Sequence, residues 1–335
     1  MNVARTNFAK FALLVLVTWL APFDRAVSQQ TSPVDVALWE SDGRLLVVNR
    51  GANTLMLLDT STGRVKSEFK CGEYPTRVLW GPRGKVAYVV CRDAHRIDRF
   101  EFTNGQLRPI SPLECGDHPV DLAIADSGQS AYVSLENRGV VSQIDLASGS
   151  VKREMAVGRG LGNLTISGGG DYLAVSVAGQ RGVAVLDLRV GALKSRQSFM
   201  GINFGHLVTS ADGSHVYFPW MVYRDNPITA TNIRKGWVLA SRVSRLQFDS
   251  DKRRDAISLD PPGRAVADPT GMVLTSRDDM VIAAGGTHEI LVLANRELPW
   301  KAYGGTDHLP LELQRDAARF RRIRVGGRPM GMAIS

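Results

Sequence analysis

One long segment of the chain carries residues suited to binding a charged ligand. The segment MVYRDNPITATNIRKGWVLA starts at Met221, between two strand-like runs. Its candidate binding residues are Tyr223, Arg224, Asp225, Arg234 and Trp237. Arginine can hold a carboxylate or phosphate through two parallel hydrogen bonds, and tryptophan supplies an apolar anchor. Long loops of this kind are often functional. The alternative is a structural lid, in which Trp237 packs inward and Asp225 pairs with an arginine.

Two histidines are the candidate metal ligands. His118 and His206 occupy matching places in two loop segments, and histidines on facing loops ligate a metal if they converge. The chain has no HxH or HExxH spacing. We therefore expect no metal site, and His118 and His206 remain candidates for binding a ligand or partner.

The chain lacks the short motifs of several enzyme classes. It has no GxSxG motif, no Gly-rich phosphate loop before a helix, and neither CxxC nor CxxCH. We expect no catalytic residue and no cofactor held by these residues. Among the three cysteines, Cys71 and Cys115 stand at equivalent places in successive repeats, while Cys91 is left over. This spacing allows a Cys71–Cys115 disulfide, or two copies of one ancestral residue.

One pattern recurs with a period of about 42 residues, the length of a propeller blade. A loop with Pro or Gly leads into an apolar strand, a tight turn such as Asp42-Gly43, and two further strands. An acidic residue followed four positions later by glycine, as at Asp59 and Gly63, closes the third strand before a more polar fourth. The units are 32–73, 74–117, 118–159, 160–201, 202–265 and 266–327.

Four antiparallel strands per unit predict an all-β fold, a β-propeller of six complete blades. We expect the innermost strand of each blade to be apolar on both faces and the outermost to meet solvent. Residues 328–335 read as the first strand of a seventh blade, so we expect a piece of a longer protein. The alternatives are a distorted six-bladed ring with an extra strand and an open β-sandwich.

The first unit resembles a known repeat. SPVDVALWESDGRLLVVNRGANTLMLLDTSTGRVKSEFKCG is similar to the YVTN-type β-propeller repeat of bacterial exported and surface proteins, with VVNR, YVVC and YVSL in place of the name tetrad. The segments RDNPITATNIRKGWVLASR and RFRRIRVGGRPM are similar to parts of propellers fused to cytochrome c modules. This resemblance implies haem c only in a downstream domain, and related propellers include lactonase-like hydrolases.

A second insertion, ELPWKAYGGTDHLPLELQRDAA, falls between strands three and four of the sixth unit. We expect it on the face opposite the first insertion, as a docking surface for a neighbouring domain or as a loop tucked under the ring. Its notable residues are Trp300, Tyr303, Asp307 and His308.

The N-terminus predicts export. Arg5 and Lys10 precede an apolar core that is too short to span a membrane comfortably, and Ala26 and Ser28 suit cleavage of a signal peptide of residues 1–28. The alternative is a membrane anchor. We expect a periplasmic, secreted or cell-surface protein without a transmembrane segment after cleavage. The net charge of +8 alone does not indicate nucleic-acid binding, which would also need a cytoplasmic location. Because the export signal argues against that location, we expect no nucleic-acid partner.

Two function classes remain. The first is an exported, non-catalytic platform that binds a protein or small-molecule ligand through its channel-face loops. The second is the propeller part of a larger redox protein with a fused or associated cytochrome c. A lactonase-like hydrolase is a weaker alternative, because it needs a metal or an acid–base cluster in the channel. The residues present favour a role without catalysis.

Overall fold

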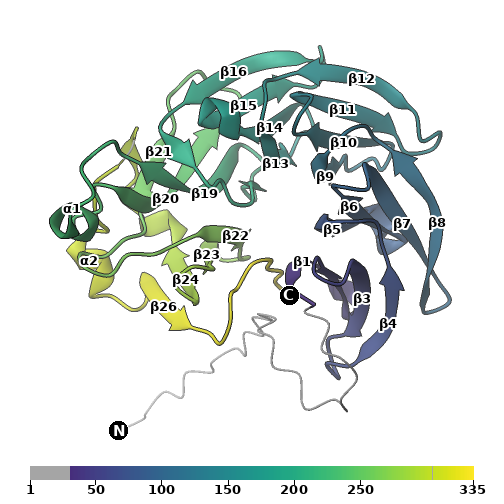
Figure 1. The fold of residues 1–335 in the computed structure, drawn as a ribbon, viewed down its shortest axis with the longest axis horizontal. Helices are drawn as coiled ribbons and strands as arrows, with labels where there is room; N and C mark the ends of the chain where they lie inside the picture. The colour runs from purple at the N-terminus through teal and green to yellow at the C-terminus, as the bar shows by residue number, and fades with distance from the viewer. Residues whose placement is uncertain (1–30, 304) are drawn as a thin grey trace, which may run out of the picture.

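Each repeat unit folds into an antiparallel sheet whose strands follow the order of the chain. The computed structural model describes residues 31–303 and 305–335, and the expected signal peptide, residues 1–28, lies outside them. Figure 1 shows the sheets as blades around one axis, with the first strand of each blade at the centre and the last at the rim. The all-β fold class is confirmed as a six-bladed β-propeller.

The first four blades are regular. Blade 1 contains β1 (Pro33–Trp39), β2 (Arg44–Asn49), β3 (Thr54–Asp59) and β4 (Val65–Lys70). Blade 2 contains β5 (Pro75–Trp80), β6 (Val86–Cys91), β7 (Arg96–Thr103) and β8 (Gln106–Glu114). Blade 3 contains β9 (Pro119–Ile124), β10 (Ser130–Leu135), β11 (Val140–Asp145) and β12 (Val151–Ala156). Blade 4 contains β13 (Leu161–Ile166), β14 (Tyr172–Val177), β15 (Gly182–Asp187) and β16 (Ala192–Ser198).

The last two blades carry the insertions. Blade 5 contains β17 (Gly201–Ile202), β18 (Val208–Thr209), β19 (His215–Tyr223), β20 (Leu239–Gln247), β21 (Asp255–Ser258) and β25 (Lys301–Ala302). Blade 6 contains β22 (Pro269–Leu274), β23 (Asp279–Ala284), β24 (Glu289–Ala294) and β26 (Phe320–Arg324). The two short helices are α1 (Ala230–Arg234) and α2 (Leu311–Gln314), one in each insertion. Within the described residues no helix is long and apolar enough to cross a membrane.

Turn chemistry explains the repeating acidic-to-glycine signature. The carboxylate of Asp59 accepts hydrogen bonds from the backbone N–H groups of Ser61 and Thr62 at 2.9 and 3.2 Å. Gly63 then takes a φ of 67°, which glycine adopts at little cost. Asp145 and Gly149 repeat this turn in blade 3. The signature therefore marks the hairpin between the third and fourth strands of a blade.

Burial corrects one expectation about the strands. The second strand of a blade is buried along almost its whole length, as in β2 and β14, whereas the innermost β1 is largely half-buried. The reason is that the innermost strand lines the central channel on its inner edge. The outermost strand β4 meets solvent as predicted.

The segment expected to begin a seventh blade forms no strand. Residues 326–335 lie beside β22 and β1. The contacts are close: a side chain at Gly271 of β22 would collide with the Met330 carbonyl, and one at Gly331 would collide with the Cα of Asp35 in β1. Figure 1 shows this last segment running from β26 to the centre of the ring. A strand requires a ladder partner, and none of the described strands pairs with it.

Candidate functional site: central channel and insertion surface

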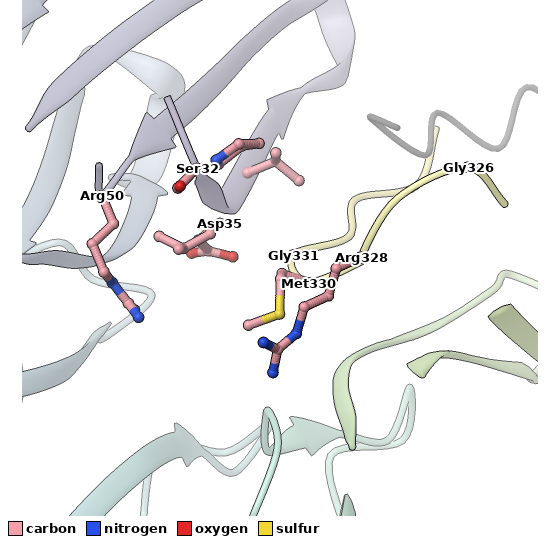
Figure 2. A pocket seen from close by; sticks show the side chains of 10 residues that line it. Ser32, Asp35, Arg50, Gly326, Arg328, Met330 and Gly331 are labelled. Atoms are coloured by element: carbon pink, nitrogen blue, oxygen red, sulfur yellow. The ribbon is translucent and has the colours of Figure 1, made fainter. Parts of the chain in front are cut away.

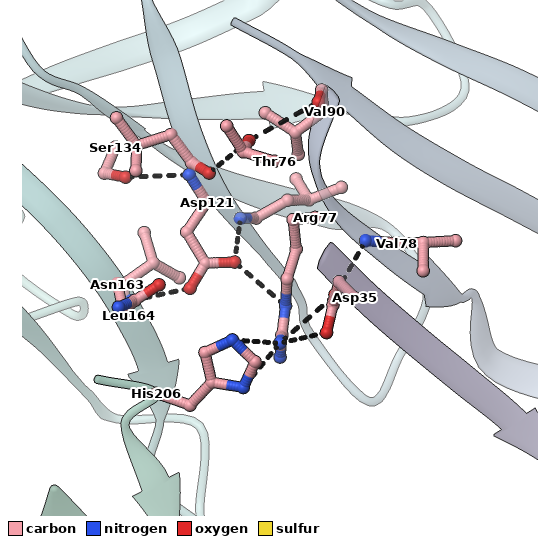
Figure 3. A network of polar contacts seen from close by, with 12 residues as sticks. Asp35, Thr76, Arg77, Val78, Val90, Asp121, Ser134, Asn163, Leu164 and His206 are labelled. Carbon is pink, nitrogen blue, oxygen red and sulfur yellow. Dashed lines mark hydrogen bonds and ion pairs between the residues drawn. The ribbon is translucent and has the colours of Figure 1, made fainter. Parts of the chain in front are cut away.

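One position of the repeat places polar side chains in the central channel. The third residue of the first strand is Asp35 in blade 1, Arg77 in blade 2, Asp121 in blade 3 and Asn163 in blade 4. Since the first strands lie side by side around the axis, residues at this register position meet at one depth of the channel. Figure 3 shows them converging.

The two aspartates bind the blade that follows their own. Asp35 accepts the backbone N–H of Val78 at 2.9 Å, and Asp121 accepts that of Leu164 at 2.9 Å. Arg77 lies between them, with Nη1 3.4 Å from Asp35 and Nε 3.1 Å from Asp121. Both carboxylates are almost fully buried, so this network fixes blades 1 to 4 to one another.

His206 completes the network from blade 5. Its Nδ1 lies 3.2 Å from Nη1 of Arg77. Burial, together with the Arg77 cation, lowers the pKa of His206 to about 3 despite the opposing charge of Asp121. The imidazole is therefore neutral at physiological pH. Burial raises the pKa of Asp35 and of Asp121, although Arg77 opposes this shift.

Cavities open above and below this network. A cavity of about 480 Å³ lies at the start of β1, where Arg50, Asp35 and Arg328 surround it (Figure 2). A second cavity of about 690 Å³ lies at the end of β1, with Arg77 and His206 on its lining. Asp35 lines the first cavity and Arg77 and His206 line the second, so the network lies between the two.

The first insertion connects β19 to β20, as the sequence predicts. Thr229 begins α1 by accepting the N–H of Asn232 at 3.1 Å, and Gly236 leaves the helix with a φ of 66°. Arg224 and Trp237, which flank this helical turn, both bind Asp307 of the second insertion, at 2.6 and 3.1 Å.

The second insertion does not stay on the opposite face. It leaves β24, adds β25 to the outer edge of β21, and then follows blade 5 until Asp307 meets the first insertion. The expectation was wrong because β25 pairs with the outer edge of β21, and this pairing holds the insertion against blade 5. We call residues 223–239, 301–303 and 305–318 the insertion surface.

The acidic residue that pairs with an arginine of the first insertion is Asp307, not Asp225. Asp225 and Arg234 are exposed, and Arg234 bonds only within its own helical turn, to the Ala230 carbonyl at 3.3 Å. Below Asp307 lies the buried Arg242, whose Nη1 donates to the Thr306 carbonyl at 2.9 Å. Burial and the Arg224 cation lower the pKa of Arg242 to about 10.

The two candidate histidines do not converge. His206 contacts Arg77 inside the channel, whereas His118 lies beside Asp117 and His95 in the loops between blades 2 and 3. The channel aspartates and Arg77 were missed by sequence reasoning. Their shared register position in PVD, PTR and PVD could have revealed them.

The three cysteines are free thiols in this structure. Cys71 contacts Cys91 within the core between blades 1 and 2, while Cys115 lies in the core between blades 2 and 3. The Cys71–Cys115 disulfide, one of the two alternatives that the spacing allowed, is not formed in this structure, because equivalent positions of successive blades belong to different cores.

Comparison with known proteins agrees with the fold. No protein-family model and no curated protein matches the chain. Hydrazine synthase of Kuenenia stuttgartiensis matches with a TM-score of 0.78 and 18% identity, over 93% of this chain and 92% of that chain. A streptogramin B lyase matches with a TM-score of 0.66 and 13% identity, over 91% and 88%. A catalytically inactive virginiamycin B lyase from Staphylococcus aureus, solved with quinupristin, gives 0.62 and 13%, over 83% and 86%.

These structural neighbours are of the propeller type. At such low identities the likeness concerns the fold alone, because one propeller scaffold hosts unrelated functions. The YVTN-type repeat remains a prediction from the sequence.

Proposed function

We propose that this chain is a non-catalytic binding module that holds a partner protein on the insertion surface. The observation that carries the proposal is the concentration of exposed apolar side chains there. Of the fifteen large apolar residues exposed among the described residues, seven belong to this surface. They are Tyr223, Ile228, Ile233, Trp237, Leu239, Tyr303 and Leu311. Clustered exposed apolar groups are typical of protein interaction sites.

Charge on and beside the insertion surface suggests the chemistry of the partner. The Lys235 ammonium lies 4.3 Å from the ring of Trp237, and the Arg253 guanidinium lies 4.5 Å from the ring of Tyr303. Cations are thus placed beside the exposed aromatic rings. A partner that presents an apolar patch with a rim of Asp and Glu would be complementary in both shape and charge.

The state of the channel residues supports binding over catalysis. Asp35 and Asp121 hold backbone N–H groups of the next blade, and the neutral His206 is packed against the Arg77 guanidinium. A general base must reach a substrate proton and accept it near neutral pH. A histidine with a pKa of about 3 is a poor base for that purpose.

Site-specific photo-crosslinking tests the proposal in cells that produce the full-length protein. A photoreactive amino acid replaces Ile228, whose side chain is 76% exposed on the insertion surface. The control replaces Val190, which is 72% exposed on blade 4. We expect one discrete protein adduct from position 228, none from position 190, and loss of the adduct in an Ile233→Asp background. Equal labelling from both positions, or no adduct from 228, would contradict the proposal.

A second candidate function is a subunit or domain of a redox assembly. It is favoured by the extent of the likeness to hydrazine synthase, which covers more than nine-tenths of both chains. If it is correct, the full-length protein or its crosslinked adduct should stain for covalently bound haem. A haem-free adduct would favour the simple binding module instead.

A further inference from the structure

Three metal-ligating side chains meet in the loops between blades 2 and 3. His95 lies in the turn from β6 to β7, and Asp117 and His118 lie in the connection from β8 to β9. One ligand atom from each residue lies within 4.8 Å of the others. No other trio of His, Cys, Asp or Glu side chains is gathered in this way within residues 31–303 and 305–335. This cluster is separate from the insertion surface.

The repeat geometry holds the two imidazoles in place. His95 and His118 have positive φ values of 57° and 48°, like Asn53 and Tyr74 one blade earlier. The Asn53 side chain accepts the N–H of Tyr74 at 3.1 Å, and Nδ1 of His95 likewise accepts the N–H of His118 at 3.2 Å. His95 therefore fills the place of an asparagine while bringing an imidazole to within 4.7 Å of the His118 ring, centroid to centroid.

The Asp117 carboxylate lies between the two rings. Its Oδ1 is 3.1 Å from Nδ1 of His95 and 2.8 Å from Nδ1 of His118. Nδ1 of His118 is buried, with this carboxylate oxygen beside it. Tetrahedral ligands at zinc's usual bond length of about 2.0 Å lie roughly 3.3 Å apart, so a small outward movement would admit an ion. Asn137 binds the carboxylate and helps to orient it.

Arg92, an arginine in the turn that carries His95, is already neutralised. Arg92 pairs with Glu136 at 2.7 Å and with Asp93 at 3.0 Å, so its positive charge is compensated locally. Its repulsion of a bound cation is therefore weak.

We propose that His95, Asp117 and His118 form a site for a divalent transition metal of the zinc type, with a fourth position open to solvent. Two imidazoles favour zinc or cobalt over calcium and magnesium, which prefer oxygen ligands. Binding would release the hydrogen bond from His118 N–H to His95, a single bond on an exposed loop. The open position would accept water or a carboxylate of a bound molecule.

Titration of the untagged, chelator-treated protein tests the site, with Co²⁺ as the spectroscopic probe and Zn²⁺ as its competitor. We expect one ion per chain and the intense visible bands of tetrahedral Co²⁺. The His95→Asn variant keeps the hydrogen-bonding role that Asn53 performs in blade 1 but loses the ligand. It and Asp117→Asn should bind at least about tenfold more weakly.

The matched control is His288→Asn, since His288 has the same φ of 57° in the equivalent turn of blade 6. It should bind the probe as the unmodified protein does, and the thermal midpoint of His95→Asn without metal should be unchanged. Absence of stoichiometric binding would overturn the proposal, as would unchanged binding in both ligand variants. An equal loss in His288→Asn would likewise exclude the assigned trio.

Discussion

At the residue scale, the contact between His206 and Arg77 makes stability depend on pH. The His206 pKa of about 3 in the folded protein lies below the ordinary histidine value of about 6.5 expected after unfolding. The unfolded chain therefore binds one more proton between these two values. The contribution of the neutral His206 side chain to the free energy of unfolding is fully present above about pH 6.5, and it is lost as the pH falls towards 3.

We therefore expect His206→Gln to remove this dependence while its amide oxygen still accepts from Arg77. Relative to the variant, the unmodified protein should lose roughly 1.4 kcal/mol of unfolding free energy per pH unit between about pH 6 and 4. Urea unfolding of both proteins at a series of pH values measures the difference. Asp35 and Asp121 act in the opposite sense because their pKa values are raised, but they are present in both proteins. Parallel curves would mean that His206 is protonated freely in the folded protein.

At the element scale, one side chain joins the two insertions. Asp307 binds Arg224 and Trp237 of the first insertion, and it lies 3.8 Å from Nη2 of the buried Arg242. Partial burial opposes ionisation, but Arg224 holds the pKa of Asp307 below its ordinary value. The carboxylate is therefore charged when it anchors the loop that carries α1.

Asp307→Ala should release this loop. Two cations and an indole N–H lose their shared acceptor, which costs about 1–3 kcal/mol where the groups are buried. We expect trypsin to cleave within residues 224–235 roughly tenfold faster, because local opening becomes easier. The control is Asp225→Ala, which removes an exposed carboxylate one residue from Arg224. Equal cleavage rates in the two variants would show that Asp307 does not anchor the loop.

The range of the contacts that form an element decides whether the sequence predicts it. Turn signatures such as Asp59 with Gly63 act between neighbouring residues, so the strands and the site of the first insertion could be predicted from local patterns. The meeting of the insertions could not, because it depends on β25 finding the free edge of β21, forty-odd residues away along the chain. The contact between Cys71 and Cys91 likewise follows from packing between blades.

At the scale of the whole molecule, apolar cores join successive blades. Each of five clusters combines residues of two neighbouring blades, from the pair of blades 1 and 2 to the pair of blades 5 and 6. At the remaining junction the described residues fall into two separate clusters, one on blade 6 and one on blade 1. No single apolar cluster of the described residues therefore joins blade 6 to blade 1.

The C-terminal segment contributes one buried side chain at that junction. Met332 packs on Val281, Ala283 and Ile290, which belong to β23 and β24 of blade 6. Its backbone neighbour Gly331 approaches Asp35 of blade 1 closely. The segment thus covers an apolar face of blade 6 and also contacts β1.

Met332→Ala should weaken blade 6 before the other blades. Loss of a buried methionine costs roughly 2–5 kcal/mol in a core, and the value here should lie at the lower end because the segment can relax into the space. Chemical denaturation measures the loss, with Met200→Ala as the control, since Met200 is 45% exposed and should change stability by less than about 0.5 kcal/mol. Hydrogen exchange should show lower protection in β23 and β24 while β10 keeps its protection, because each blade contacts only its neighbours. A uniform loss of protection in all six blades would instead mean that the ring opens as a single cooperative unit.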